Sequence, residues 1–350
     1  MTWMLTGGAG YIGGHVARAL RAAGHDLVVI DDLSTGIAER VQGLHLVEAS
    51  LLDGPSRLAA VLTEHEVGGI VHLAAKKAVP ESVDRPLYYY EQNVTGTIAL
   101  LRAAVQAGVH HILYSSSAAV YGETAAGRID EGHPTSPTNP YGETKLAAEW
   151  LVRRTAEAHG MSWTALRYFN VAGAADARLA DRGVFNLLPI VLRRVDEGRP
   201  VSVFGGDWPT PDGSCVRDYV HVEDVADAHR AAVDALDAEQ LRAGIFNVGR
   251  GEGVSVLEYA VRGRANGWPS GGPSDRCPPS RRPSHRRGRR IGNRGRPEVD
   301  GRARHPRHRD QRLAGPAQLP RWVMLGTVII RHSARTVTRP WAQVPEREFD

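Results

Sequence analysis

The sequence predicts an α/β fold with a doubly wound parallel sheet, and three observations support this. Short apolar runs alternate with amphipathic runs over residues 1–175. A glycine-rich loop follows the first apolar run, and a pair of acidic residues ends the second. Strands that alternate with helices are typical of βαβ units, whose right-handed crossovers produce a parallel sheet.

The expected elements of this sheet follow from the two hydrophobic periods. Strands are expected at Thr2–Thr6, Leu27–Asp31, Leu44–Val47, Gly69–Leu73, His111–Ser115 and Ser162–Arg167. Helices are expected at Ile12–Ala23, Pro55–Glu64, Val94–Ala107 and Tyr141–His159. Apolar residues recur every three to four positions in the helical runs, and the strand runs are short and continuous, as in strands buried on both faces.

A smaller lobe is expected after residue 175. Its helices are predicted at Val184–Asp196 and Val222–Leu236, and its strands at Val201–Phe204 and Gly244–Val248. We expect this lobe to cover the carboxyl ends of the parallel strands, because doubly wound sheets bind their ligands there.

The pattern ends near Tyr259, where the composition changes. Residues 261–350 contain 21 arginines, no lysine and seven acidic residues, whereas residues 1–260 are net acidic. This segment is rich in proline, glycine and serine and has little apolar periodicity, so it is predicted to be disordered. Three interpretations remain: a reading-frame shift in a GC-rich gene, which truncates the second lobe, a native disordered tail, or a nucleic-acid contact. We favour the frame shift and expect no nucleic-acid partner.

Composition excludes several classes of protein. A chain of 350 residues is expected to form about two lobes. No apolar run is long enough for a membrane span, and the amino terminus lacks the features of a signal peptide. The two cysteines exclude a disulfide framework and favour a cytoplasmic location, and neither has the spacing of a metal site.

The glycine-rich loop predicts a Rossmann-like dinucleotide site. Gly7, Gly10 and Gly13 follow a strand and open a helix, which is the context that makes such a motif informative. Gly7 permits the turn, Gly10 lets the backbone approach a pyrophosphate, and Gly13 lets the helix pack on the sheet. The helix N-terminus then supplies N–H groups to the phosphates.

Residues at the ends of the next strands indicate which dinucleotide binds. Asp31 can hydrogen-bond the adenosine ribose, and Asp32 adds negative charge that would repel a 2′-phosphate, so NAD is expected rather than NADP. Leu73 and the small residues after it can let a nucleotide approach closely. Asn93 precedes an expected helix, where it can bond the cofactor or the backbone, or cap the helix.

A tyrosine and a lysine in the helix after the fifth strand indicate proton and hydride chemistry. Tyr141 and Lys145 lie four residues apart, on one face of a helix. An ammonium beside a phenol favours the phenolate, so Lys145 is expected to lower the pKa of Tyr141. Ser117 ends the fifth strand, where it can share a hydrogen bond with Tyr141 and a substrate hydroxyl.

Seven segments together resemble the extended short-chain dehydrogenase/reductase family, and within it the UDP-hexose 4-epimerases. They occur in order over residues 1–260, at Thr6–Gly13, Lys77–Ser82, Asn93–Thr97, Ser115–Gly122, Asn139–Lys145, Leu166–Asn170 and Val216–Val222. The resemblance implies that residues 1–175 bind NAD, that residues 176–260 form a partial UDP-sugar lobe, and that the chain is a homodimer.

The resemblance also implies roles for individual residues. Tyr141 is then the base, Lys145 binds the nicotinamide ribose, and Ser117 assists proton transfer. Asn170 and Arg217 then bind the UDP group, for which a guanidinium is well suited. The further cofactor contacts that it implies are Tyr11, Ile12, Leu73, Lys77, Asn93 and Tyr168.

The implied reaction is the interconversion of UDP-glucose and UDP-galactose by oxidation at C4, rotation of the 4-keto sugar and re-reduction. Ala118 and Ala119 lack the acid and base that a related dehydratase needs, so dehydration is disfavoured. Epimerases of UDP-uronates or UDP-N-acetylhexosamines remain alternatives. An NAD-binding protein with impaired catalysis is another alternative, because the segment after Tyr259 offers no convincing second phosphate-binding arginine.

Overall fold

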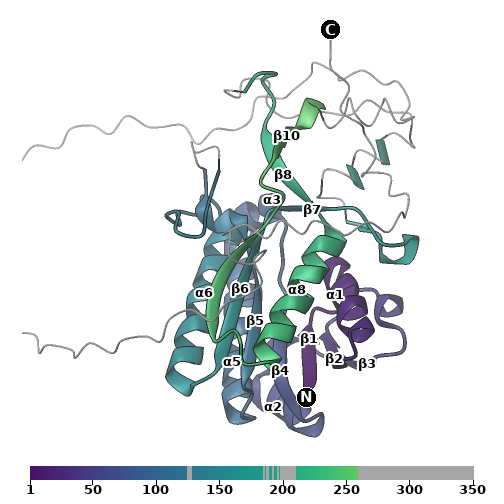
Figure 1. The fold of residues 1–350 in the computed structure, drawn as a ribbon, viewed down its shortest axis with the longest axis vertical. Helices are drawn as coiled ribbons and strands as arrows, with labels where there is room; N and C mark the ends of the chain where they lie inside the picture. Colours follow the sequence, from purple (N-terminus) through teal and green to yellow (C-terminus); the bar gives the residue numbers. More distant parts are fainter. Residues whose placement is uncertain are drawn as a thin grey trace, which may run out of the picture.

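The computed structural model describes residues 1–123, 128–183, 186, 189–190, 193–194, 197 and 210–258. A seven-stranded sheet has the order β3-β2-β1-β4-β5-β6-β9, and all its neighbouring strands are parallel. A three-stranded sheet has the order β10-β8-β7. The predicted α/β fold with a doubly wound parallel sheet is confirmed (Figure 1).

The elements have the following bounds. The main sheet contains β1 Thr2–Thr6, β2 Asp26–Asp31, β3 His45–Glu48, β4 Val67–His72, β5 His111–Ser117, β6 Ser162–Tyr168 and β9 Ala243–Val248. The small sheet contains β7 Asn170–Ala172, β8 Val216–His221 and β10 Gly253–Ser255. The α-helices are α1 Tyr11–Ala22, α2 Pro55–Glu64, α3 Val79–Asp84, α4 Pro86–Tyr89, α5 Gly96–Gln106, α6 Pro140–His159 and α8 Val222–Asp237. Short helical segments are η1 Ala38–Val41, η2 Leu51–Asp53, η3 Tyr90–Thr95, η4 Ala118–Tyr121 and η5 Ala177–Leu179.

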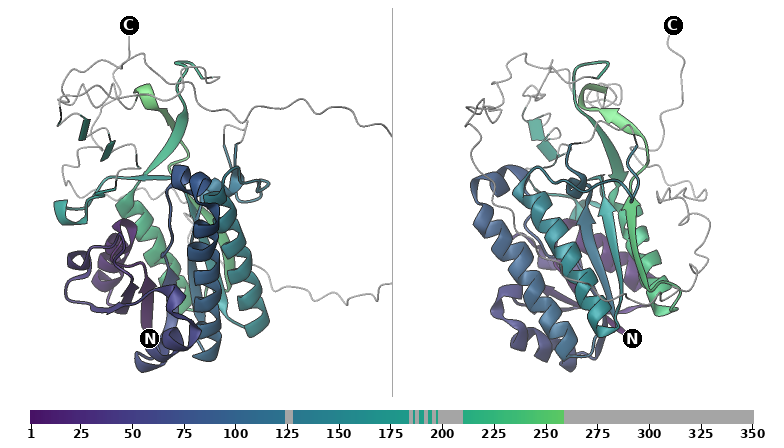
Figure 2. Two further views of the ribbon diagram at one scale, coloured as in Figure 1. Left: turned by 180° about the vertical axis from the view of Figure 1, so that it is seen from behind. Right: turned by 90° about the vertical axis from the view of Figure 1, so that its left-hand side faces the viewer.

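Helices cover both faces of the main sheet and create two hydrophobic cores. One core joins the sheet to α2, α5 and α6, and the other joins it to α1 and α8. Figure 2 shows the two layers from the side, with the small sheet beyond the carboxyl ends of the parallel strands. This arrangement leaves those strand ends facing the small sheet, which is where a ligand is expected.

Helix α6 begins at this edge for local reasons. The Asn139 side chain accepts a hydrogen bond from the Gly142 N–H at 2.9 Å, which caps the helix, and Pro140 occupies its first position. Gly160 ends the helix in the left-handed conformation, with φ 69°. Tyr141 and Lys145 are therefore in the first two turns, close to the strand ends.

Two elements expected in the second lobe belong to the main layer instead. β9 was predicted at Gly244–Val248 as part of that lobe, but it pairs with β6 in parallel. α8, predicted at Val222–Leu236, buries its apolar face against α1 and the sheet. The reason is that β9 pairs along the edge strand β6 and α8 packs beside α1, contacts between distant segments that periodicity alone does not specify.

Other bounds differ in smaller ways. The helix predicted at Val94–Ala107 is preceded by a π-helical segment, η3, which begins at Tyr90. The helix predicted at Val184–Asp196 lies largely outside the described residues, and the strand at Val201–Phe204 and residues 261–350 lie entirely outside them. Among the described residues, no helix has the length and hydropathy of a membrane span.

Candidate cofactor and catalytic site

A cavity of about 470 Å³ lies at the carboxyl ends of β1, β2 and β4 and reaches α6. Ten of the predicted site residues line it, namely Gly7, Gly10, Tyr11, Ile12, Gly13, Asp31, Asp32, Leu73, Lys77 and Tyr168, together with the pair Tyr141 and Lys145. The cavity therefore joins the expected nucleotide loop to the expected catalytic helix in one space.

The glycine-rich loop leaves no room for side chains at two positions. A Cβ atom on Gly13 would lie 2.3 Å from the Gly7 carbonyl oxygen, and one on Gly7 would lie 2.7 Å from Ala74 Cα. Gly7 also has φ 70°, which glycine adopts without strain. Gly10 is the N-cap of α1 and has no side chain to bond the first N–H groups of the helix. This geometry fits a pyrophosphate, as the sequence predicts.

Asp31 holds the glycine-rich loop through hydrogen bonds to its backbone. Its carboxylate accepts hydrogen bonds from the Ala9 N–H at 3.0 Å and the Leu33 N–H at 2.9 Å. Burial raises the pKa of this carboxyl. Asp31 thus orders the backbone of the nucleotide loop, and its contact with a ribose remains a prediction.

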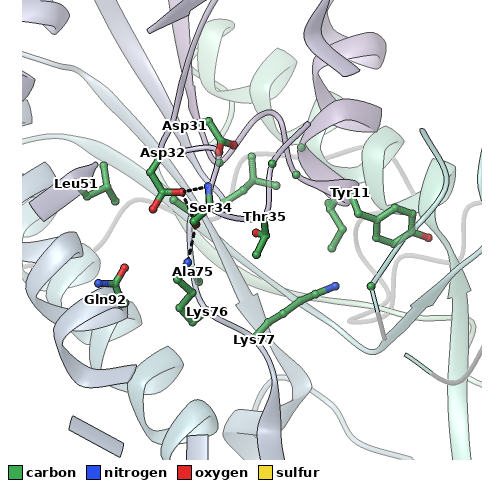
Figure 3. A pocket seen from close by; sticks show the side chains of 18 of the residues that line it. Tyr11, Asp31, Asp32, Ser34, Thr35, Leu51, Ala75, Lys76, Lys77 and Gln92 are labelled. Atoms are coloured by element: carbon green, nitrogen blue, oxygen red, sulfur yellow. Dashed lines mark hydrogen bonds between the residues drawn. The ribbon is translucent and has the colours of Figure 1, made fainter. Parts of the chain in front are cut away.

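A polar bridge crosses the neighbouring part of the cavity (Figure 3). Asp32 accepts hydrogen bonds from the Ser34 N–H at 3.0 Å and the Ser34 hydroxyl at 2.5 Å. The Lys76 ammonium in turn donates to the Ser34 hydroxyl at 2.7 Å. The segment after β2 is therefore tied to the segment after β4, and both carry groups that can bond a ribose.

The part of the cavity near Tyr11 carries a lysine. Lys77 extends toward Tyr11, and its Nζ lies 5.7 Å from the centre of that ring (Figure 3). The Tyr11 hydroxyl donates to the Gly173 carbonyl at 2.6 Å, which fixes the ring. This position is consistent with the expected role of Lys77 near the phosphates.

The predicted catalytic group is assembled on β5 and α6. The Tyr141 hydroxyl hydrogen-bonds the Ser117 side chain, and Lys145 Nζ donates to the Ser115 carbonyl at 2.9 Å. Ser117 itself is also bonded by the Ala119 N–H at 3.2 Å, which orients its hydroxyl. A base candidate, a hydroxyl and a cation thus converge at the end of one strand.

The protonation of this group differs from the expectation in one respect. Burial raises the pKa of Tyr141, and its hydrogen bond with Ser117 only partly opposes this. Burial lowers the pKa of Lys145 to about 7. The Tyr141 pKa in this structure is thus set by burial and by Ser117, and its lowering by a Lys145 ammonium stays a prediction.

Four predicted residues lie outside the lining of this cavity, and one of them, Ser117, bonds the lining residue Tyr141. Asn93 is 3% exposed, and its amide bonds the Lys76 backbone and Thr144. Asn170 on β7 and Arg217 on β8 lie on paired strands of the small sheet. Asn170 Nδ2 donates to the Asp218 carbonyl at 3.4 Å, and Arg217 is exposed. The structure thus brings Asn170 and Arg217 together but separates them from the cofactor cavity.

Several lining residues were not identified from the sequence. They include Ser34, Thr35, Gly36, Arg40, Leu51, Leu52, Lys76, Gln92, Asp181, Arg182 and Gly183. Ser34 to Gly36 directly follow the acidic pair, so their position in the chain was a usable signal. The other residues come from short helical segments and loops, whose approach to the cavity depends on the tertiary fold.

Comparison with known proteins identifies the family. Residues 3–249 match the model of the NAD dependent epimerase/dehydratase family. The UDP-glucose 4-epimerase of Lacticaseibacillus casei is 44% identical over 266 residues, which cover 74% of this chain and 79% of that protein.

Solved structures show the same fold. The UDP-glucose 4-epimerase of Stenotrophomonas maltophila, solved with NAD and formylated UDP-arabinopyranose, has a TM-score of 0.72 and 39% identity, covering 76% of this chain and 83% of that one. The Bifidobacterium longum enzyme, solved with NAD+ and UDP, has a TM-score of 0.70 and 34% identity, with the same coverage. By its fold, its nucleotide loop and its sequence match, this chain belongs to the NAD-dependent epimerase/dehydratase family.

Proposed function

We propose that this chain is an NAD-dependent UDP-glucose 4-epimerase, which interconverts UDP-glucose and UDP-galactose in galactose metabolism. The observation that carries this proposal is that Tyr141 and Lys145 line the same cavity as the glycine-rich loop, with Ser117 beside Tyr141. Family membership and the relatives that bear this name support the same activity.

The residues of the nucleotide cavity are suited to NAD. The loop from Gly7 to Gly13 and the N-terminus of α1 bind the pyrophosphate, and Asp31 with its neighbour Asp32 disfavours a 2′-phosphate. Lys77, Tyr168 and Lys145 line the cavity. We assign the phosphates to the neighbourhood of Lys77, and the nicotinamide to that of Tyr168 and Lys145. NAD held by these residues would supply the hydride acceptor for oxidation of the sugar carbon and the hydride donor for its re-reduction.

The catalytic residues manage the proton that accompanies this transfer. Tyr141 removes the proton from the sugar 4-hydroxyl as that carbon is oxidised, and Ser117 shares the hydrogen bond. Lys145 in its ammonium form stabilises the phenolate. The 4-keto sugar then rotates about its link to the diphosphate, so that reduction from its other face, with the proton returned by Tyr141, yields the epimer.

We assign the UDP group to the small sheet. Asn170 and Arg217 lie on β7 and β8, beyond the carboxyl ends of the main strands. An arginine can make charge-assisted, bidentate contacts with a diphosphate. Residues 1–175 and 176–260 are proposed as the NAD-binding and UDP-sugar-binding parts, although α8 and β9 of the second part complete the main sheet.

We propose that the reading frame changes near residue 260. The family match ends at residue 249, before the arginine-rich segment begins. Translation of the other two frames of the gene beyond this point tests the idea. A frame that encodes amphipathic helices and a further phosphate-binding arginine is expected, and its absence from both frames would show that the segment is native.

The test of the activity is a coupled assay of UDP-galactose conversion to UDP-glucose. Tyr141→Phe removes only the ionisable hydroxyl and should lower kcat by about 10²–10⁴-fold while NAD binding is retained. UDP-uronates and UDP-N-acetylhexosamines serve as competing substrates that identify the preferred sugar. No turnover of any UDP-sugar by NAD-loaded protein would contradict the proposal.

We also propose that the chain is a homodimer that pairs through α6 and the segments beside it. Exposed apolar side chains lie on this side at Val83, Leu87, Tyr90 and Trp150. They come from α3, α4, η3 and α6, and the Tyr90 hydroxyl donates to Glu143 of α6 at 3.0 Å, which joins the two segments. Apolar side chains gathered on neighbouring helices favour association with a second copy.

A further inference from the structure

A hydrogen-bonded network of buried polar side chains extends from the residue before the glycine-rich loop to the start of the catalytic helix. Thr6 Oγ1 lies 2.7 Å from His72 Nδ1, and His72 Nε2 lies 2.9 Å from Thr97 Oγ1. Thr97 Oγ1 lies 2.6 Å from the Asn93 carbonyl, and Asn93 Nδ2 lies 3.0 Å from Thr144 Oγ1. All five side chains are at most 3% exposed.

The hydrogen-bond donors on both sides of His72, and therefore its tautomer, can be assigned. A carbonyl cannot donate, so Thr97 uses its one hydroxyl hydrogen on the Asn93 carbonyl. Toward His72 the Thr97 oxygen can therefore only accept, which places the imidazole hydrogen on Nε2. The unprotonated Nδ1 of a neutral His72 then accepts from the Thr6 hydroxyl.

The same reasoning assigns the donors and acceptors at Thr144 and Asn93, the other end of the network. Thr144 donates to the Tyr141 carbonyl at 2.8 Å, so its oxygen accepts from Asn93 Nδ2. The Asn93 amide also accepts from the Lys76 N–H at 2.8 Å and donates to the Lys76 carbonyl at 2.9 Å, which excludes a flipped amide. Asn93 thus ties the cavity wall after β4 to the first turn of α6.

His72 is suited to this position because it stays neutral. Burial lowers its pKa to about 3, and the positive charge of Lys145 acts in the same direction. The ring packs against Tyr114, with ring centres 5.6 Å apart. A neutral imidazole offers one donor and one acceptor at opposite sides of a rigid ring, and the two neighbouring threonines require that pair.

We propose that His72 is a positioning residue that couples the nucleotide loop to the catalytic helix, so that the cofactor cavity and Tyr141 keep a fixed separation. At the loop end, Thr6 directly precedes Gly7, and its Oγ1 also accepts from the Ala74 N–H at 3.3 Å. At the helix end, Thr144 lies beside Lys145 and bonds the backbone of Tyr141. The effect on turnover rests on the proposed epimerase activity, whereas the effect on NAD affinity does not.

A double-mutant cycle between the two ends tests this coupling. Thr6→Val and Thr144→Val each replace a buried hydroxyl with a methyl group of similar size, and the two side chains have no bond to each other. Each change should weaken NAD binding and lower kcat by about tenfold, the scale of one lost buried hydrogen bond. The double variant should also lose only about tenfold, because either break releases the same coupling.

Thr164→Val provides a matched control. Thr164 is fully buried on β6, and its hydroxyl has no hydrogen-bond partner within the part of the chain that the structure describes. The same chemical change there should leave NAD affinity and kcat unchanged. A cycle between Thr164 and Thr144 should be additive.

Variants at His72 separate positioning from simple packing. His72→Gln retains a donor and an acceptor and should stay within about threefold of the wild-type kcat, whereas His72→Phe should lose about tenfold. The substrate KM should change little, and deuterium at C4 of the sugar should slow the Phe variant more than the wild type, because hydride transfer becomes limiting. If His72→Phe fails to fold, the threonine variants still decide the question.

The outcomes distinguish this inference from the proposed function. Additive losses in the Thr6–Thr144 cycle, about a hundredfold for the double variant, would overturn the coupling. A wild-type protein that binds NAD but converts no UDP-sugar would overturn the epimerase proposal alone, because the cycle measured on NAD affinity would still test His72.

Discussion

Arg167 on β6 and Glu149 on α6 form a buried ion pair beneath the catalytic residues. Their side chains are 5% and 3% exposed, and Arg167 Nε donates to Glu149 at 3.0 Å. Ser116 also donates to Glu149, at 2.8 Å, and Arg167 donates to the Tyr121 hydroxyl at 3.0 Å. Glu149 is one helical turn beyond Lys145, so the pair fixes α6 against the strands that carry the catalytic serines.

Breaking this pair from one side should be costly. Glu149→Gln leaves the Arg167 guanidinium buried without its counter-charge, which should lower the free energy of unfolding by about 3–5 kcal/mol. The double change Glu149→Leu with Arg167→Met removes both charges and should recover much of that loss. Urea denaturation measures the free energy of unfolding of both variants.

The exposed pair of Arg153 and Glu157 on the same helix is the control. Its side chains are 47% and 41% exposed, so Glu157→Gln should change stability little. A Glu149→Gln variant as stable as Glu157→Gln would show that the buried pair does not hold the helix.

Gly13→Ala should damage the nucleotide loop. The new Cβ would lie 2.3 Å from the Gly7 carbonyl oxygen and 2.7 Å from Gly8 Cα, so the loop or helix α1 must move. Such overpacking costs ~1–3 kcal/mol, and we expect NAD affinity to fall about tenfold or more. Isothermal titration with NAD measures the effect.

Gly132→Ala is the comparison for that change. A Cβ there would lie 3.4 Å from Asp130 Oδ1, an ordinary contact, and the residue is exposed. NAD affinity equal in the two variants would contradict the steric argument for Gly13.

Sequence reasoning succeeded where a local pattern determines the structure. The strand at Thr2–Thr6 and the loop after it were predicted because glycine spacing and apolar runs act within a few residues. The neighbourhood of Tyr141 and Lys145 followed from helical geometry alone.

Sequence reasoning failed where partners are far apart in the chain. The pairing of β9 with β6 joins segments about 80 residues apart, and no local pattern specifies it. The amide of Asn93 bonds the Lys76 backbone and Thr144, partners that only the tertiary fold brings together. The raised pKa of Tyr141 likewise depends first on burial, which the spacing of Tyr141 and Lys145 does not reveal.

The free energy of unfolding of the NAD-free protein should depend on pH through Lys145. Burial lowers the Lys145 pKa from 10.5 to about 7, so between these values the unfolded chain binds a proton that the folded chain does not. Because of this group, the free energy of unfolding increases as pH rises from 7, by up to ~1.4 kcal/mol per pH unit.

Lys145→Met removes that dependence. The variant should exceed the wild type in stability most at pH 7 and below, and its advantage should shrink steadily toward pH 9. Denaturation of NAD-free protein at pH 6, 7, 8 and 9 measures the difference. A difference that stays constant over this range would show that Lys145 is not held with a lowered pKa.

The proposed dimer depends on the apolar side of α6. Trp150 is 57% exposed there, and Leu87 on α4 is 83% exposed, which is a large apolar area to leave in water. Trp150→Glu would place a charge in the interface, where it would face its own copy across a two-fold axis, and it should convert the dimer to a monomer. Sedimentation velocity measures the change.

Val216→Glu is the control. This site is 40% exposed on the small sheet, and the change should leave the dimer intact. A wild-type chain that sediments as a monomer, or a Trp150→Glu variant that remains dimeric, would assign this surface to another role.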